Sequence, residues 1–218
     1  MSRKGCCDRL PGERKLKEIF KVSRGTLREA LRALEQKGLI TLKTGIQGGA
    51  IVCSLNGEQV SESLDLLLRY QKVSLKELGE FRELVEPLVA AKAVQKAKKE
   101  DIRQLTSIVE SIKNHLNASE PKWDKLITED TKFHLTLAQI AGNRVFESVL
   151  STIYSNINHY FDQFLPRDIK ILKGIYKDFC EIVKAIEEGN SNQAGKIILS
   201  HVKRFNQMMQ KKREKDPG

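Results

Sequence analysis

Three side chains in the C-terminal part of the chain, Asp130, His134 and His201, could share one metal ion (the Asp-His-His group). Asp130 and His134 are four positions apart, so on a helix both project from the same face. His201 lies midway between Ile197 and Phe205, and this apolar stripe predicts that its ring points inward. One carboxylate and two imidazoles suit a divalent ion of the Zn, Ni or Mn class. An ion pair between Asp130 and His134, with His201 as a hydrogen-bonded core residue, explains the same pattern without a metal.

A second set of polar residues could bind a small organic acid: Arg82, Asn143 and His159. Arg82 is four positions from Glu86, so its guanidinium either meets an effector carboxylate or forms a salt bridge within its helix. Asn143 is equally suited to cap the start of a helix. Because a buried carboxylate and two buried imidazoles need a partner, we expect a pocket beside the Asp-His-His group that takes such an acid, with or without a metal.

Small and basic residues suited to DNA gather at the start of a predicted helix: Ser23, Arg24, Gly25, Thr26 and Arg28. The serine hydroxyl can cap this helix, and the helix dipole at that end favours phosphate. Arg24, Arg28 and Arg32 recur every four positions and form a basic row beside an apolar one. The glycine lets the backbone come close, and the threonine offers a hydroxyl or a methyl group. Arg32 is the one member of the row that a solvated surface explains equally well.

The formal net charge of the 218-residue chain is +10, and most of it lies near the N-terminus. Residues 1–56 hold twelve basic and five acidic side chains, whereas the rest of the chain is nearly balanced. A basic segment attached to a balanced body is typical of a protein that binds a polyanion such as double-stranded DNA. A merely solvated charged surface is the alternative.

The pattern of residues 11–53 predicts a winged helix-turn-helix. A short helix over 13–20 and a second helix from Ser23 to Gly38 are followed by two extended runs, 39–43 and 50–53. The connection between these runs holds three glycines, which favours a β-hairpin whose loop needs positive φ. In such a fold the second helix enters the major groove, and the hairpin lies along the minor groove or the backbone.

After a turn-rich linker the sequence shows only helical periodicity, which predicts an antiparallel bundle of six or seven helices. The expected helices cover residues 58–70, 74–97, 99–117, 121–141, 143–164, 166–188 and 191–212. Pro87 lies inside the second of these and predicts a kink or a break there. We therefore expect a mainly α protein, with a winged helix-turn-helix domain over residues 1–55 and an all-helical domain over 56–218.

Several classes of protein do not fit this sequence. It has no apolar run long enough to cross a membrane and no N-terminal secretory signal. Four cysteines without metal-ligand spacing are typical of reduced thiols in a cytoplasmic protein. Without a Glu-x-x-His pair of the di-iron kind, a His-Glu-x-x-His motif, a glycine-rich phosphate loop or a nucleophile elbow, we expect no enzyme. The alternatives are a helical metal-binding enzyme and a non-specific DNA-binding protein, which would bind any DNA with a steep salt dependence.

The stretch LPGERKLKEIFKVSRGTLREALRALEQKGLI resembles the signature of the GntR family of bacterial transcription regulators. In that family a Leu-Pro-Ser-Glu-Arg stretch opens the helix-turn-helix, and a Ser-Arg-x-x-x-Arg-Glu-Ala-Leu stretch forms the recognition helix. The resemblance implies DNA contacts from Arg14, Arg24 and Arg28, and from wing glycines at Gly48 or Gly49. Relatives carry a further helix ahead of this stretch, where this chain has only MSRKGCCDR. We therefore expect a domain that lacks its first helix, through a misplaced start or a truncation.

Residues 60–210 resemble the C-terminal ligand-binding domain of FadR-type regulators, the FCD domain of the same family. The resemblance is carried by Glu80-Phe81-Arg82-Glu83-Leu84-Val85-Glu86, Asp130-x-x-Phe133-His134, Gly142-Asn143 and Ile182-x-x-Ala185-Ile186 ahead of His201. It implies sequence-specific operator binding that a small-molecule effector, commonly a carboxylic acid, modulates. Because one small DNA-binding domain covers too few bases to specify a site, we expect a homodimer on a pseudo-palindromic operator. Residues 56–218 are then the effector-binding and dimerisation domain.

Many relatives hold a divalent metal with an Asp-x-x-x-His pair and two later histidines, and a carboxylate effector often completes the metal shell. Counted back from Ile182, one of these histidine positions falls on Phe179 here, and a phenyl ring cannot bind a metal. Position 179 shares an apolar stripe with Ile175, Ile182 and Ile186, so we expect it to face the core.

The Asp-His-His group alone would still form an open site with three protein ligands. His159, Asp178 or Cys180 could supply the missing ligand instead. The last two, however, point about 100° away from the direction of Phe179 on an ideal helix.

Overall fold

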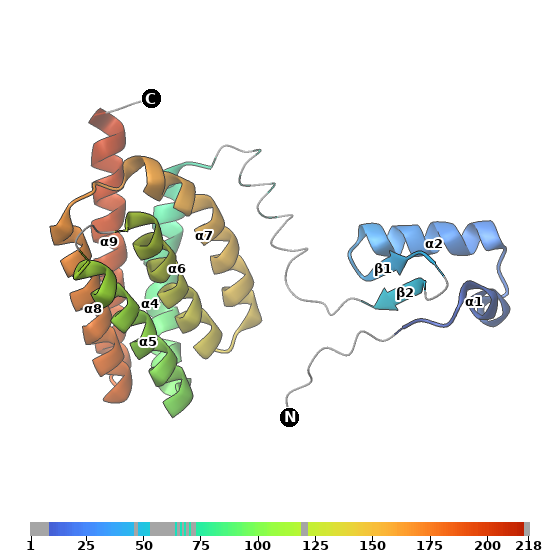
Figure 1. Cartoon of the computed structure of the whole chain (residues 1–218), viewed down its shortest axis with the longest axis horizontal. Coiled ribbons are helices and arrows are strands. Elements are labelled where there is room, and N and C mark those ends of the chain that lie inside the picture. Colours follow the sequence, from blue (N-terminus) through green and yellow to red (C-terminus); the bar gives the residue numbers. More distant parts are fainter. Residues whose placement is uncertain are drawn as a thin grey trace. The chain divides into compact units, whose positions relative to one another are not determined.

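The computed structural model describes residues 9–45, 48–52, 64, 66, 68, 70, 73–118 and 122–215. The chain divides into two compact units, Met1–Val60 and Ser61–Gly218 (Figure 1). We call them the N-terminal unit and the helical unit.

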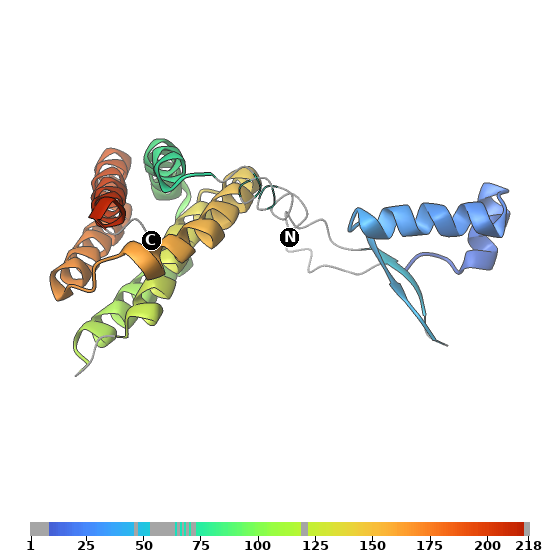
Figure 2. The same cartoon turned by 90° about the horizontal axis from the view of Figure 1, so that it is seen from above.

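The N-terminal unit consists of two helices followed by a hairpin. Helix α1 spans Glu13–Phe20, α2 spans Arg24–Gln36, and strands β1 (Ile40–Lys43) and β2 (Gly49–Val52) pair antiparallel. These bounds agree with the predicted helix-turn-helix and wing. A small core joins the four elements through five buried side chains: Leu16, Leu27, Leu31, Ile40 and Ala50. Figure 2 shows the hairpin extending away from the two helices.

Local residue chemistry fixes the ends of these elements. Ser23 caps α2, since its hydroxyl accepts the Thr26 backbone N–H at 3.1 Å. Gly38, with φ of 65°, ends the helix as the sequence predicts. Gly49 has a φ of 138°, which only glycine adopts readily. A side chain at position 48 would bring its Cβ to 2.7 Å from the Gly45 carbonyl oxygen, so the wing needs a glycine there too.

The helical unit packs its helices around one continuous core. The described helices are α4 (Leu75–Lys96), α5 (Lys99–Leu116), α6 (Trp123–Ile140), α7 (Arg144–Phe164), α8 (Ile169–Glu187) and α9 (Ser191–Lys215). Figures 1 and 2 both show α4 and α9 side by side. Each helix starts within four residues of the prediction. The predicted helix over 58–70 lies mostly outside the described residues.

Two features of this unit bear on the expectations from sequence. Helix α4 does not break at Pro87 but continues from Leu75 to Lys96. The proline lies close against α9, because a Cβ on Gly195 would be only 3.1 Å from the Pro87 carbonyl oxygen. Among the described helices, none is long and apolar enough to cross a membrane.

Candidate metal, effector and DNA-binding sites

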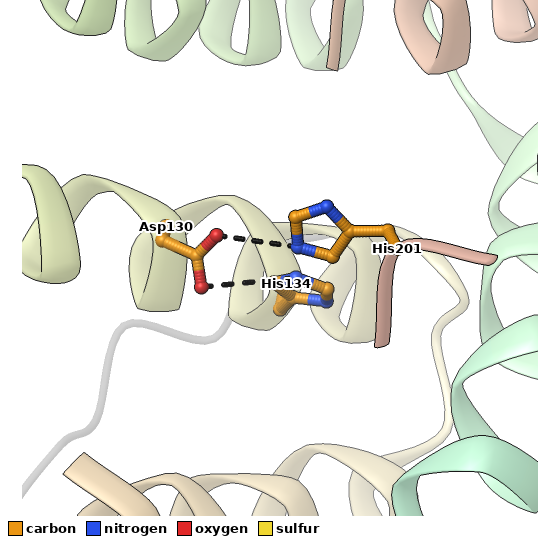
Figure 3. A group of neighbouring side chains, drawn as sticks. All are labelled: Asp130, His134 and His201. Carbon is orange, nitrogen blue, oxygen red and sulfur yellow. Dashed lines mark ion pairs between the residues drawn. The ribbon is translucent and has the colours of Figure 1, made fainter. Parts of the chain in front are cut away.

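The structure brings Asp130 and His134 of α6 together with His201 of α9 (Figure 3). All three are buried, with exposed fractions of 3% or less. The Asp130 carboxylate faces both rings from one side, with Oδ1 3.4 Å from His201 Nε2 and Oδ2 3.9 Å from His134 Nε2. One possible ligand atom from each residue lies within 4.8 Å of the others. The group therefore has the size of a metal site.

Each imidazole also contacts a second carboxylate through its Nδ1 atom. His134 Nδ1 contacts Glu86 Oε2 of α4, and His201 Nδ1 is 2.9 Å from Asp178 Oδ2 of α8. Metal-binding histidines commonly donate their second ring N–H to a carboxylate, which fixes the tautomer and the ring orientation. In this arrangement both Nε2 atoms face Asp130.

Three buried atoms at the centre of the group lack a hydrogen-bond partner among the described residues: Asp130 Oδ1, His134 Nε2 and His201 Nε2. The 3.4 Å between Asp130 Oδ1 and His201 Nε2 exceeds a normal hydrogen-bond length. Buried polar atoms are almost always paired, and leaving one unpaired costs about 1–3 kcal/mol. Three such atoms close together fit a bound cation. This argument depends on the geometry of the group and not on any resemblance to other proteins.

A buried ion pair supports the group from α4. Arg82 Nε donates to Glu86 Oε1 at 2.5 Å, and Arg82 Nη2 donates to the Tyr154 hydroxyl of α7 at 2.7 Å. The salt bridge within the helix is thus formed, and whether Arg82 also meets an effector stays a prediction. Arg82 Nη1 is buried and has no hydrogen-bond partner among the described residues.

Electrostatics keep these buried acids ionised. Burial raises the pKa of Glu86, but the charges of Arg82 and His134 outweigh it and hold that pKa at about 2. Burial likewise opposes the charged form of Asp130, whose pKa is nevertheless lowered by His201 and His134. Burial lowers the pKa of His201, and the adjacent Asp130 and Asp178 more than reverse this. The carboxylates of Glu86 and Asp130 are thus held in their charged forms, and that of Asp130 faces both imidazoles.

Phe179 lies against both imidazoles and is fully buried, as its stripe on α8 predicts. Its ring stacks on Phe133 at 3.9 Å, and its centroid is 5.7 Å from that of His134 and 5.1 Å from that of His201. A phenyl ring therefore fills the place that the resemblance gives to a further histidine, and among the described residues the group offers three candidate ligands.

Three further residues were predicted for this site: Asn143, His159 and Cys180. Asn143 is exposed and caps α7 by accepting the Val145 backbone N–H at 3.0 Å. His159 belongs to α7, but its side chain is outside the described residues. Cys180 is a half-buried free thiol.

The predicted DNA-binding residues lie on the surface of the N-terminal unit. Arg14, Ser23, Arg24, Gly25, Thr26 and Arg28 are all exposed, and Gly48 and Gly49 lie in the wing. Glu13 pairs with two of the arginines, at 3.6 Å from Arg24 and 3.2 Å from Arg28. The sequence does not predict this role for Glu13. Glu13 belongs to α1, and only the packing of α1 against α2 brings it close to the two arginines.

Comparisons with known proteins agree with both halves of this description. Residues 5–49 match the gntR family of bacterial regulatory proteins, and residues 77–204 match the FCD domain. The HTH-type transcriptional regulator LutR of Bacillus subtilis is 28% identical over 199 residues, which cover 89% of this chain and 88% of the relative. The Uxu operon regulator of Haemophilus influenzae is 30% identical over 202 residues, covering 89% and 71%. The chain belongs to the GntR family of bacterial transcription regulators.

A solved structure places the fold in the same family. Streptococcus agalactiae GntR superposes with a TM-score of 0.73 at 27% identity, covering 92% of this chain and 89% of that one. The chain is therefore a mainly helical, DNA-binding transcription regulator with an FCD domain, as its sequence predicts. Because the family and the relatives are regulators rather than enzymes, the metalloenzyme alternative is set aside.

The sequence does not predict the contacts that Glu86 and Asp178 make with the two imidazoles. Glu86 was considered only as a partner of Arg82, and Asp178 only as a substitute ligand, whereas each holds one imidazole through Nδ1. The available signal was weak: both are acidic residues next to apolar stripes. Which histidine each one meets is decided by the packing of α4 and α8 against α6 and α9.

Proposed function

We propose that this regulator binds a pseudo-palindromic operator as a homodimer, and that a small carboxylic acid bound in the helical unit changes its affinity for that operator. The observation that carries the effector part is the cluster of three unpartnered buried atoms, Asp130 Oδ1, His134 Nε2 and His201 Nε2. A folded protein rarely retains such a cluster unless an ion or a ligand satisfies it.

Asp130, His134 and His201 are the residues that would hold a divalent ion of the Zn, Ni or Mn class. Such an ion, when bound, supplies a positive charge and an open coordination position for one carboxylate oxygen. Glu86 and Asp178 orient the two imidazoles. The unpartnered Nη1 of Arg82 is the second group in this region that a carboxylate could satisfy.

Metal content and thermal stability test the metal part. We expect the purified protein to carry a divalent ion in native mass spectrometry, and a chelator to lower its melting temperature. His134→Ala should remove both the ion and the sensitivity to chelator. His115→Ala is the matched control, because His115 is a half-exposed histidine on α5 outside the group. A wild-type protein without metal and without a chelator effect would leave only direct binding of the acid.

DNA recognition is assigned to the start of α2, to Arg14 of α1 and to the wing. The exposed Arg24 and Arg28 would reach base edges or phosphates from the first turns of α2, and Gly48 and Gly49 would let the wing approach the backbone. The pairs that Glu13 makes with the two arginines are exposed and weak. They can therefore give way to phosphates without a large loss of stability.

The homodimer is assigned to an exposed apolar stripe on α4. Leu84 and Leu88 are 74% and 61% exposed, and their four-residue spacing places them side by side on the surface of α4. Glu80 lies one turn before them and Lys92 one turn after. If a second copy packs antiparallel on this stripe, Leu84 of one chain meets Leu88 of the other, and Glu80 meets Lys92. The stripe is therefore complementary to itself in charge as well as in apolar contact.

A charge swap tests this interface. Glu80→Lys should weaken the dimer, because it places a lysine opposite Lys92 of the other copy, and Lys92→Glu should act alike. The double variant should restore dimerisation, measured by sedimentation equilibrium. Glu100→Lys on α5, an exposed residue with one surface ion pair, is the control. A double variant as weak as the single ones would place the interface elsewhere.

A further inference from the structure

A surface groove lies between α8 and α9, which pack side by side (Figure 1). Its volume of about 430 Å³ is within the range of about 300–1,000 Å³ that is usual for small-molecule sites. Three basic side chains line it: Lys170 and Lys177 of α8, and Arg204 of α9. Two carboxylates, Asp178 and Glu181, and three apolar residues complete its wall. No member of the Asp-His-His group lines this groove.

The basic side chains of the groove suit an anion with more charge than a carboxylate. Arg204 pairs with Asp178, and Lys177 Nζ lies 3.8 Å from Glu181 Oε1, so two of the three cations already have a carboxylate partner. Lys170 is exposed near the start of α8. A phosphate monoester carries about two negative charges at pH 7 and has three acceptor oxygens, one for each cation. It can therefore compete with a carboxylate for Arg204 and Lys177.

The apolar part of the groove suits a small carbon skeleton. Ile171 of α8 and Met208 of α9 are half-buried and line the groove from its two sides. A Cβ on Gly174, in the middle of α8, would meet nothing within 4 Å. Glycine weakens the interior of a helix, and at this position it leaves room for part of a ligand.

Arg204 connects the groove with the Asp-His-His group. One oxygen of Asp178, Oδ2, contacts both Arg204 and His201 Nδ1, the latter at 2.9 Å. The Asp178 side chain is 14% exposed and that of Arg204 is 44% exposed. An anion in the groove can thus take Arg204 as its partner while Asp178 stays at His201. The Asp178 carboxylate then keeps more of its negative charge for the imidazole.

We propose that this groove is a second ligand site, that it binds a small organic phosphate through Lys170, Lys177 and Arg204, and that binding there changes the surroundings of His201 through Asp178. The site goes beyond the proposed function, whose effector binds elsewhere in the helical unit. Its consequence for a metal rests on the proposed function. A carboxylate with more charge makes its histidine a stronger ligand, so the phosphate should tighten zinc binding, and zinc should tighten phosphate binding equally.

Isothermal titration calorimetry with glucose 6-phosphate tests the site in the full-length protein without added metal. We expect this compound to bind on the order of ten-fold more tightly than inorganic phosphate, because its carbon skeleton covers the apolar part of the groove. Succinate should bind more weakly than glucose 6-phosphate, and glucose should not bind. Equal binding of succinate and glucose 6-phosphate, or binding of glucose, would show that the groove does not recognise phosphate.

Variants of α8 show whether the phosphate binds in the groove. Lys170→Ala should weaken binding of glucose 6-phosphate by about ten-fold, because it removes one charge-assisted hydrogen bond. Lys173→Ala is the matched control, since Lys173 is exposed on the same helix but does not line the groove. Gly174→Leu should fill the groove and abolish binding without lowering the melting temperature, because leucine is the better helix former. Equal affinities in the two lysine variants, or undiminished binding in Gly174→Leu, would place the phosphate elsewhere and overturn the proposal.

Histidine NMR tests the connection to His201 without a metal. The chain has four histidines, so the ring signals of protein with isotope-labelled histidine can be assigned one by one with variants. Saturating glucose 6-phosphate should shift the His201 signal and leave that of His115 on α5 unchanged. Arg204→Gln without phosphate should shift the His201 signal in the same direction, because it also removes the cation from Asp178. A His201 signal that moves in neither case would overturn the connection.

Zinc affinity separates this inference from the proposed function. Competition against a chromophoric chelator should show zinc binding that is on the order of five-fold tighter with glucose 6-phosphate present, and no such change in Gly174→Leu. A protein that binds glucose 6-phosphate in the groove but no zinc would contradict the metal part of the proposed function and leave the second site standing. Zinc binding of equal strength with and without glucose 6-phosphate would overturn the coupling between the two sites.

Discussion

The two units of the chain place their arginine–glutamate pairs in opposite surroundings. In the N-terminal unit, Glu13 and its partners Arg24 and Arg28 have side chains that are 39%, 68% and 54% exposed. In the helical unit, Arg82 and Glu86 are 1% and 3% exposed. Exposed pairs contribute about 0–1 kcal/mol, whereas removing one partner of a buried pair costs about 3–5 kcal/mol. The same chemistry therefore leaves the two arginines exposed in one unit and holds a buried cluster of polar side chains together in the other.

Breaking the buried pair should give the largest effect. Glu86→Ala leaves the Arg82 guanidinium buried without its carboxylate and frees His134 Nδ1, so we expect the free energy of unfolding to fall by about 3–5 kcal/mol. Urea denaturation followed through Trp123 reports this unit, since the single tryptophan lies on α6.

Glu13→Ala is the matched change in the N-terminal unit. Its pairs are exposed, so amide hydrogen exchange in α1 and α2 should correspond to a loss of no more than about 1 kcal/mol. Equal losses in the two variants would show that burial does not distinguish the two ion pairs.

The exposed arginines should affect DNA binding rather than folding. Arg24→Ala or Arg28→Ala should cost about 1–3 kcal/mol of operator affinity where the arginine contacts a base, with relaxed preference at one position. An arginine that contacts only phosphate should weaken binding to all sequences and reduce the salt slope by about 1. Gel-shift titrations on a selected operator at several salt concentrations measure both quantities. Unchanged affinity in both variants would remove α2 as the recognition helix.

A histidine at position 179 would offer the Asp-His-His group a fourth ligand. Phe179→His replaces a ring that touches both imidazoles, so it should tighten zinc binding by on the order of ten-fold. Competition against a chromophoric chelator measures the dissociation constant. Phe179→Leu is the control, because it also removes the stack on Phe133 but adds no ligand. If the two variants bind zinc equally, position 179 does not face the metal position.

Sequence patterns predicted those parts of the molecule that depend on one element at a time. Helical periodicity located all six described helices of the helical unit, and the four-residue spacing placed Asp130 and His134 on one face. The partners of the imidazoles depend instead on how separate helices pack. The sequence shows that Asp178 points away from the direction of Phe179, but its contact with His201 Nδ1 depends on the position of α9 relative to α8.

Pro87 shows that a rule about one residue type also depends on how the helices pack. Proline removes one backbone hydrogen bond and was expected to kink or break its helix. Helix α4 continues past the proline without a break, and buried residues hold it on both sides: Leu78 before the proline, and Val89 and Ala90 after it. The break, one of the two expected outcomes, therefore does not occur, and the sequence of α4 alone does not show how much packing in the core will stabilise the helix.

The smallest expected effect concerns the start of α1, where Gly12 is the N-cap and provides no side-chain hydrogen bond. The GntR signature has serine at this place, and a Cβ built on Gly12 meets nothing within 4 Å. Gly12→Ser should therefore let a hydroxyl accept a backbone N–H of the first turn and stabilise the N-terminal unit by a few tenths of a kcal/mol. Hydrogen exchange of the α1 amides measures the gain. Gly12→Ala provides the control, because it restricts the unfolded chain equally but cannot accept a hydrogen bond. Slower exchange in the serine variant alone would identify the cap as the cause, whereas equal slowing in both would assign the gain to the unfolded state.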